Sequence, residues 1–370
     1  MKTPTSRRLH VGLDARSLGG RVCGVSRYAH RLLTALARID TDNCYTIFIR
    51  PPQPELILPA NFSIVAVDLS RMLPWDDRLF SSRLKKERLD VFHSFHSWLP
   101  PALPDSIRAV LSLHDVLAID DPEFFASRGI FAPLLRQHFI RLTKRSVARA
   151  DRIITVSEAS VRAIVRIFPE AEKKLRSIPN AAGIIPLQTA ELRPPKDYIL
   201  FVGNLRSYKN PGVLFQAFSQ FVKRNPSSRL KLIVAGNDDS SKAEHWIVNT
   251  GLHRRVEFHV RPSDEQLAAL YERASVLVLP SNEEGFGIPV LEAMSFGVPT
   301  IVSDAPALIE VAGGASLVFP RRDPHALCGR IEEILSADRA AFAAAGRARA
   351  AAFSWDTSAL ELRRVYESLR

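Results

Sequence analysis

Short apolar runs rich in β-branched residues alternate with longer amphipathic segments along almost the whole chain. This alternation is typical of repeated βαβ units, whose strands form a parallel sheet covered by helices on both faces. In the first half, helices are predicted at 24–39, around 78–88 and on both sides of the sixth strand. Strands are predicted there at 9–14, 44–49, 62–67, 91–94, 109–113, 152–156 and 175–178.

The pattern stops and then starts again. Prolines gather without periodicity between 179 and 196, so an interdomain linker is predicted at 181–197. Beyond it, the predicted strands are 198–203, 230–235, 256–258, 276–279 and 300–302. The predicted helices are 211–224, 243–249, 264–273, one from 287, a long one around 326–351 and a last one at 355–369. The fold class is therefore α/β, with Rossmann-like domains at 1–180 and 198–352 facing across a cleft, the default ligand site.

The composition also favours two domains. The chain has 370 residues, of which 46% are hydrophobic, more than one compact core usually absorbs. No stretch reaches the roughly 20 apolar residues of a membrane span, and no apolar signal segment begins the chain, so we expect a cytoplasmic protein. Cys23, Cys44 and Cys328 lack the spacing of a disulfide framework or a zinc site, and we expect them to be reduced.

The net charge of +11 is concentrated in the N-terminal half. Before residue 190 there are 28 basic and 18 acidic residues, and after it 22 and 21. This asymmetry indicates an acidic partner, an anionic lipid surface or nucleic acid, although a solvated basic face explains any single cluster equally well. One predicted helix aligns basic with apolar side chains, which makes a peripheral membrane contact one interpretation. Its residues are Arg136, Arg141, Lys144, Arg145 and Arg149, beside Leu134, Leu135, Ile140, Leu142 and Val147.

The segment 280–294 carries the strongest functional signal. It follows a predicted strand, its glycines allow a ligand to approach the backbone, and Pro289 suits the first turn of a helix. A helix N-terminus offers free N–H groups and a positive dipole end, which suit a diphosphate. Glu284 and Glu292 are acceptors suited to vicinal hydroxyls, as in a sugar ring and a ribose. The alternative is a structural turn with two surface glutamates, but Glu292 lies among apolar residues, where an unpaired carboxylate is costly.

A second candidate loop follows the first strand of the second half. Arg206 and Lys209 lie in this strand-to-helix connection, where two cations could neutralise a leaving diphosphate without a metal. An ordinary loop with two solvated bases is the alternative. The position of Arg206 and Lys209 on the same sheet edge as Glu284 favours the functional interpretation.

His114 and Asp115 end a strand of the buried type. At a carboxyl end they would face the cleft and could orient sugar hydroxyls, although a lone histidine at such a position is more often structural. His93 and His96 are interpreted as core or rim residues. The glycine-rich loop before the first helix lacks the G-x-G-x-x-G pattern, and no acidic residue ends the second strand, which disfavours a dinucleotide dehydrogenase.

Taken in order, these segments resemble the retaining glycosyltransferases of family 4, which have the GT-B fold. The resemblance covers nearly the whole chain, including Gly24-Val-Ser-Arg-Tyr28, Leu113-His-Asp-Val116, Lys209-Asn210 and Glu284-Gly-Phe-Gly287 through Glu292. It implies that a C-terminal helix, about 353–370, crosses back onto the first domain. One departure is Ile178-Pro-Asn-Ala-Ala182, where many members have Asn-Gly.

The resemblance also implies roles for individual residues. Arg206 and Lys209 would contact the donor diphosphate, Glu284 the hydroxyls of the transferred sugar, Glu292 the ribose, and His114 the sugar. The implied catalytic set is Glu284, His114, Arg206 and Lys209. The implied donor-binding set is Gly203, Arg206, Lys209, Glu284, Gly285, Phe286, Gly287, Ile288 and Glu292. The implied acceptor-side set is Gly20, Gly24, Arg27, Tyr28, His114 and Asp115.

The family uses no essential metal and no cofactor beyond the nucleotide-sugar donor, and it retains the anomeric configuration. The version with His-Asp and Gly-Val-Ser-Arg-Tyr looks most like bacterial mannosyltransferases of surface polysaccharide assembly. GDP-mannose is thus the favoured donor, and a lipid-linked oligosaccharide held at an anionic membrane the favoured acceptor. A transferase using a UDP-sugar or dTDP-rhamnose, and a noncatalytic sugar-nucleotide or polysaccharide-binding protein, remain alternatives. A nucleic-acid partner is not expected, because the chain lacks a clustered aromatic and basic motif.

Overall fold

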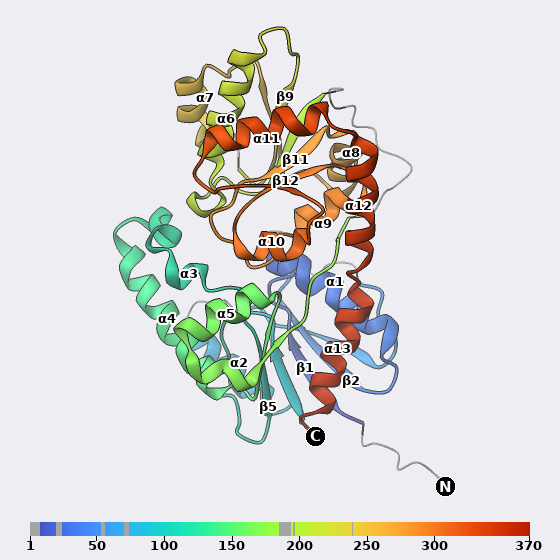
Figure 1. Cartoon of the computed structure of the whole chain (residues 1–370). Coiled ribbons are helices and arrows are strands. Elements are labelled where there is room, and N and C mark those ends of the chain that lie inside the picture. The colour runs from blue at the N-terminus through green and yellow to red at the C-terminus, as the bar shows by residue number, and fades with distance from the viewer. Residues whose placement is uncertain are drawn as a thin grey trace. The chain divides into compact units, whose positions relative to one another are not determined.

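The computed structural model describes residues 8–19, 24–52, 56–69, 74–184, 194, 197–238 and 240–370. The chain forms two compact units, each with strands at its centre and helices around them (Figure 1). Unit 1 comprises Met1–Asp120, Ser127–Asn180 and Ser354–Arg370. Unit 2 comprises Asp121–Ala126 and Ala181–Phe353. The predicted linker at 181–197 lies mostly outside the described residues.

Unit 1 is built on a seven-stranded parallel sheet. Its strands are β1 (His10–Asp14), β2 (Cys44–Ile49), β3 (Phe62–Ala66), β4 (Val91–Ser94), β5 (Arg108–Ser112), β6 (Arg152–Thr155) and β7 (Leu175–Ser177). They are ordered β3-β2-β1-β4-β5-β6-β7, so the order reverses at β1, the topology of a doubly wound fold. Each strand predicted in this half is confirmed to within one residue.

Helices cover this sheet. They are α1 (Gly24–Ile39), α2 (Pro74–Leu84), α3 (Leu117–Asp120), α4 (Ala132–Arg149), α5 (Glu158–Ile167) and α13 (Trp355–Glu367), with 3₁₀ segments η1 (Pro122–Phe131) and η2 (Pro169–Lys174). The last helix, α13, packs along α1, and the Ser358 hydroxyl donates a 2.6 Å hydrogen bond to the carbonyl of Pro179. The predicted return of the C-terminal helix to the first domain is therefore confirmed.

Unit 2 repeats the design with six parallel strands. These are β8 (Tyr198–Val202), β9 (Lys231–Gly236), β10 (Val256–Val260), β11 (Val276–Leu279), β12 (Thr300–Ser303) and β13 (Leu317–Phe319), ordered β10-β9-β8-β11-β12-β13. The first four residues of β8 and all of β11 are fully buried, as expected for strands covered on both faces.

The helices of unit 2 are α6 (Pro211–Arg224), α7 (Glu244–Thr250), α8 (Asp264–Arg273), α9 (Ile288–Ser295), α10 (Pro306–Ala312), α11 (Pro324–Ser336) and α12 (Arg339–Ala351), with 3₁₀ turns η3 (Ser207–Lys209) and η4 (Ser240–Lys242). Local signals set their starts. The clearest is α8, where Ser263 and Gln266 form a reciprocal capping box.

Two predictions of local structure were wrong, and two elements were missed. The long helix expected around 326–351 is two helices, because Ala337 is extended and the Asp338 carboxylate accepts a 2.9 Å hydrogen bond from the Ala340 N–H, which starts a new helix. The helix expected at 78–88 begins and ends earlier, as α2. The elements α10 and β13 were not predicted at all. No helix within the described ranges combines the length and the apolar character needed to cross a membrane.

Candidate active site

Two loops of unit 2 come together because their strands are neighbours. Strands β8 and β11 pair in parallel, with Val276 opposite Ile199, so both chains leave the sheet at the same carboxyl edge. The loop after β8 carries Arg206 and Lys209, and the loop after β11 carries Glu284. The structure thus places the two predicted donor loops side by side.

The Lys209 ammonium forms an ion pair with the Glu284 carboxylate. Both side chains are largely buried, with exposed fractions of 13% for Lys209 and 8% for Glu284. The Ser281 hydroxyl donates a 2.8 Å hydrogen bond to Oε1 of Glu284, and Ser281 is itself fully buried. A charge-assisted bond of this kind holds the carboxylate in one orientation at the sheet edge.

The turn into α9 depends on Gly287. Its φ is +104°, a backbone conformation that side chains of L-residues rarely adopt. A Cβ at this position would lie 2.6 Å from Cδ2 of Leu308. Pro289 then stands within the first turn of α9, where its missing N–H costs nothing. The glycine therefore aims the N-terminus of α9, with its N–H groups and positive dipole end, just beyond Glu284.

The remaining donor-side residues occupy the same two connections. Gly203 directly follows β8, and Arg206 is exposed at the start of the η3 turn. Gly285, Phe286 and Ile288 lie between Glu284 and the body of α9. A residue that follows β9 holds the loop after β8 in place: the Asp238 carboxylate accepts a 2.8 Å hydrogen bond from the Leu205 N–H.

Glu292 lies within α9 and is only 2% exposed. The hydroxyl of Tyr271, on α8, donates a 2.7 Å hydrogen bond to its Oε2. This hydrogen bond offsets part of the free energy that burial among apolar residues costs a carboxylate. Tyr271 was not among the predicted site residues, and no motif joins it to a position 21 residues away.

In unit 1, His114 follows β5 and is held as a neutral imidazole. Burial lowers its pKa to about 4, partly opposed by a hydrogen bond with the backbone of Phe95. The Tyr28 ring packs edge-on against it, with 4.5 Å between ring centroids. Among the described residues, none forms a hydrogen bond with Nε2 of His114, a buried atom. The bond to the Phe95 backbone raises the pKa, so the ring donates in it, and in the neutral ring Nε2 is left as an acceptor for a hydroxyl.

The other predicted acceptor-side residues lie on different elements of unit 1. Asp115 accepts a 3.0 Å hydrogen bond from the Leu117 N–H and so starts α3. Gly24 and Arg27 lie in the first turn of α1, while Gly20 lies outside the described residues. Tyr28 is only 3% exposed, its hydroxyl lies 3.4 Å from Oγ of Ser112, and burial raises its pKa to about 12. Tyr28 therefore contacts the predicted site through the His114 ring.

His93 and His96 lie in the core of unit 1, as the sequence indicated. His93 is fully buried between Tyr366 and Ser112, and burial lowers its pKa to about 3. His96 lies with Nε2 3.8 Å from Oδ1 of Asp14. Asp14 in turn forms a bidentate ion pair with Arg16, both about 1% exposed, a buried charge pair at the end of β1 that sequence reasoning missed.

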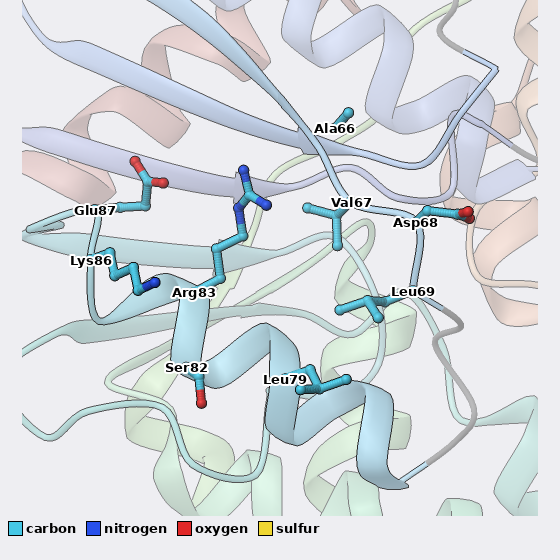
Figure 2. A pocket seen from close by; sticks show the side chains of 9 residues that line it. All are labelled: Ala66, Val67, Asp68, Leu69, Leu79, Ser82, Arg83, Lys86 and Glu87. Atoms are coloured by element: carbon cyan, nitrogen blue, oxygen red, sulfur yellow. The ribbon is translucent and has the colours of Figure 1, made fainter.

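A cavity of about 600 Å³ lies beyond β3 in unit 1. Figure 2 shows that α2 and the turn after it supply one wall and the chain after β3 the other. Apolar side chains of Leu69 and Leu79 line it, together with the cations Arg83 and Lys86 and the carboxylate of Glu87. None of these residues was predicted to belong to a site, because neither α2 with the turn after it nor the chain after β3 carries a motif.

Two family models divide the chain between them. The model described as Glycosyltransferase Family 4 matches residues 22–182, and the model described as Glycosyl transferases group 1 matches residues 188–349. The first match falls in the region of unit 1 and the second in that of unit 2.

Several curated proteins are similar over most of their length. The O-antigen chain mannosyltransferase B of Escherichia coli is 30% identical over 293 residues, 75% of this chain and 74% of that protein. The O-antigen chain mannosyltransferase RfbU of Salmonella typhimurium is 31% identical over 325 residues, 82% of this chain and 85% of that protein. A D-inositol 3-phosphate glycosyltransferase of Corynebacterium diphtheriae is 31% identical over 392 residues, covering 94% of this chain and 90% of that protein.

Among solved structures, a sucrose-phosphate synthase from Thermosynechococcus elongatus is similar throughout. Its TM-score is 0.78 at 22% identity, with 98% of this chain and 99% of that chain covered. At this identity the likeness concerns the fold, which is the GT-B arrangement expected from the sequence.

Proposed function

The chain belongs to the family 4 glycosyltransferases, and we propose that it moves mannose from GDP-mannose to a lipid-linked or oligosaccharide acceptor of O-antigen-type polysaccharide, with retention of configuration. The observation that supports transfer from a sugar nucleotide is the buried pair of Lys209 and Glu284 on neighbouring loops, and the similarity to O-antigen chain mannosyltransferases supports mannose. Lys209 supplies a cation for a diphosphate and Glu284 an acceptor for sugar hydroxyls, which is the combination that a sugar nucleotide requires.

The residues of unit 2 suit departure of a nucleoside diphosphate. Negative charge develops on the diphosphate as the bond to the sugar breaks, and the charges of Lys209 and Arg206 and the N-terminus of α9 would lower its energy. Because these groups can neutralise the departing diphosphate, the reaction is proposed to need no metal ion. Within the described residues, no three metal-ligating side chains gather at one place. In unit 1, the neutral His114 ring is proposed to bind a hydroxyl of the transferred sugar.

The donor is tested with a panel of GDP-mannose, UDP-glucose, UDP-N-acetylglucosamine and dTDP-rhamnose. Binding is measured by saturation-transfer NMR and donor hydrolysis by release of the nucleoside diphosphate, each with and without EDTA. GDP-mannose should bind most tightly, and EDTA should leave its rate unchanged. Tight binding of a uridine donor with none of GDP-mannose would overturn the proposed donor, and a rate abolished by EDTA would overturn the metal-free mechanism.

The acceptor is proposed to be reached at an anionic membrane, through the start of α4. Ile130, Phe131 and Leu134 are large apolar side chains exposed to 89%, 61% and 69%. Leu134, Arg141 and Arg145 follow one another at intervals of seven and four residues, so they share one face of the helix. No acidic residue occurs between 124 and 150. An apolar cluster with cations beside it is complementary to a bilayer of anionic lipids.

This surface differs from the basic stripe expected from the sequence. The Arg136 guanidinium donates to the carbonyl of Ile119, and Arg149 donates to that of Ile107 at 2.9 Å, so both serve the fold. Val147 is fully buried. The membrane surface proposed here consists of Ile130, Phe131, Leu134, Arg141, Lys144 and Arg145.

A further inference from the structure

Tyr271 and Glu292 belong to different helices of unit 2 and meet inside it. Tyr271 is fully buried in α8, and Glu292 is 2% exposed in α9. The Tyr271 hydroxyl donates to Oε2 of Glu292 at 2.7 Å, within the range of a strong bond to a charged acceptor. The two helices are thereby joined at the one carboxylate that α9 carries.

The position of the hydroxyl is itself determined by packing. The Tyr271 ring stacks on that of Phe296, with 5.6 Å between centroids and 27° between planes. A ring held in this way has little freedom to turn, so its hydroxyl marks a fixed point for the carboxylate. A glutamate side chain has three rotatable bonds, so a hydrogen bond at its carboxylate reduces the number of rotamers that it samples.

We propose that Tyr271 is a positioning residue for ribose recognition: it holds the Glu292 carboxylate in the orientation that receives the vicinal hydroxyls of the donor's ribose. The inference rests on the proposed function, because it requires a donor that contains a ribose. A carboxylate has about four acceptor positions, and the bond from the Tyr271 hydroxyl determines the direction in which the others point. Tyr271 acts on the ligand only through Glu292.

The fold offers a matched control in Tyr198, the first residue of β8. It is also fully buried in unit 2, and its hydroxyl donates to the backbone carbonyl of Leu270 at 2.5 Å. Tyr198→Phe and Tyr271→Phe each remove one buried hydroxyl and keep the ring. A purely structural role for the Tyr271 hydroxyl predicts that the two variants behave alike toward nucleotides.

The test measures the binding of GDP and 2′-deoxy-GDP, and of UDP and 2′-deoxy-UDP, by calorimetry on the full chain. For the base that binds, the wild type should prefer the ribonucleotide. Tyr271→Phe should weaken ribonucleotide binding by about tenfold, the size of one hydrogen bond to a charged group, and barely change binding of the deoxy form. In turnover the variant should raise KM for the donor and leave kcat within about twofold. Tyr198→Phe should change neither.

A double-mutant cycle with Glu292→Gln keeps the inference testable if Tyr271→Phe is destabilised. In the Glu292→Gln background the tyrosine substitution should have no further effect on the ribonucleotide, because its partner carboxylate is gone. Equal losses for ribo- and deoxynucleotides, or equal effects of the two tyrosine variants, would overturn the inference. A wild type that binds none of the four nucleotides would instead refute the proposed function.

Discussion

The hydroxyl of Tyr366 lies 2.6 Å from Nδ1 of His93, so the last helix of the chain contacts a buried histidine of β4. The other ring nitrogen of His93 lies 2.9 Å from Oγ of Ser112, which in turn lies 3.4 Å from the hydroxyl of Tyr28. Tyr28 packs against His114. A continuous set of polar and aromatic contacts therefore runs from α13 to the histidine at the end of β5.

Burial of His93 makes the stability of the protein depend on pH. Its pKa is lowered to about 3, first by burial and then by the nearby His114, whereas an unfolded histidine titrates near 6.5. Below about pH 6.5, His93 becomes protonated in the unfolded chain but stays neutral in the folded chain. The free energy of unfolding should therefore fall as pH drops from about 6.5 toward 3, by up to about 1.4 kcal/mol per pH unit for this residue.

Urea denaturation between pH 7.5 and 4.5 measures this slope. His93→Gln should flatten it without abolishing it, because His114 also has a lowered pKa and remains in the variant. His245→Gln, at an exposed position of α7, is the matched control and should leave the slope unchanged. An identical slope in wild type and His93→Gln would contradict the account of a neutral buried His93.

Glu284 is expected to be indispensable for transfer. Glu284→Ala removes both the partner of Lys209 and the acceptor for sugar hydroxyls, so the rate should fall by at least about 100-fold, the scale of losing a key electrostatic contact. Circular dichroism should show an unchanged fold. The control is Glu283→Ala, because Glu283 is 58% exposed and pairs with Arg321 instead. An unchanged rate in Glu284→Ala would remove the assignment of this residue.

The sequence predicted those parts of the fold that a short stretch of residues determines by itself. Strands buried on both faces appear as apolar runs, so those found in both units were located from the pattern alone. The elements α10 and β13, seven and three residues long, were missed, whereas α7 and β7, of the same lengths, were predicted, so length alone does not decide whether a period stands out. The region around 326–351 was predicted as one helix because no change in its apolar pattern marks the point where α11 ends. The separation comes from Asp338, whose carboxylate caps the start of α12.

The site shows the same division. Arg206, Lys209 and Glu284 follow predicted strands, so placing them at a sheet edge needed only the rule for parallel strands. That β8 and β11 are neighbours is a property of the sheet order, which sequence spacing does not encode. Tyr271 and Tyr366 were missed for a related reason. Each reaches its partner through the packing of one element on another, and each alone looks like an ordinary apolar position of an amphipathic helix.

Gly287 is expected to tolerate no side chain. At a φ of +104°, Gly287→Ala introduces backbone strain of about 1–3 kcal/mol, and the new Cβ would also clash with Leu308. The melting temperature should fall, and transfer should fall further than stability explains, because the turn aims α9. Gly329→Ala in α11 is the control. A Cβ there meets nothing within 4 Å, so that variant should be as stable as the wild type or more stable. Equal melting temperatures for both variants would contradict the strain argument.

The exposed start of α4 is expected to bind anionic bilayers, which sedimentation with vesicles measures. The wild type should bind vesicles containing phosphatidylglycerol much more strongly than vesicles of phosphatidylcholine alone. Phe131→Ser combined with Leu134→Ser removes apolar area from the surface, and binding should fall severalfold at any salt concentration. Arg141→Gln combined with Arg145→Gln should weaken binding to the anionic vesicles by about 1 kcal/mol for each charge, and this loss should shrink as salt rises.

Val248→Ser, at an apolar position of α7 that is 55% exposed, is the control and should bind like the wild type. If that control lost as much binding as the α4 variants, or if phosphatidylcholine vesicles bound equally well, the membrane surface would not lie on α4.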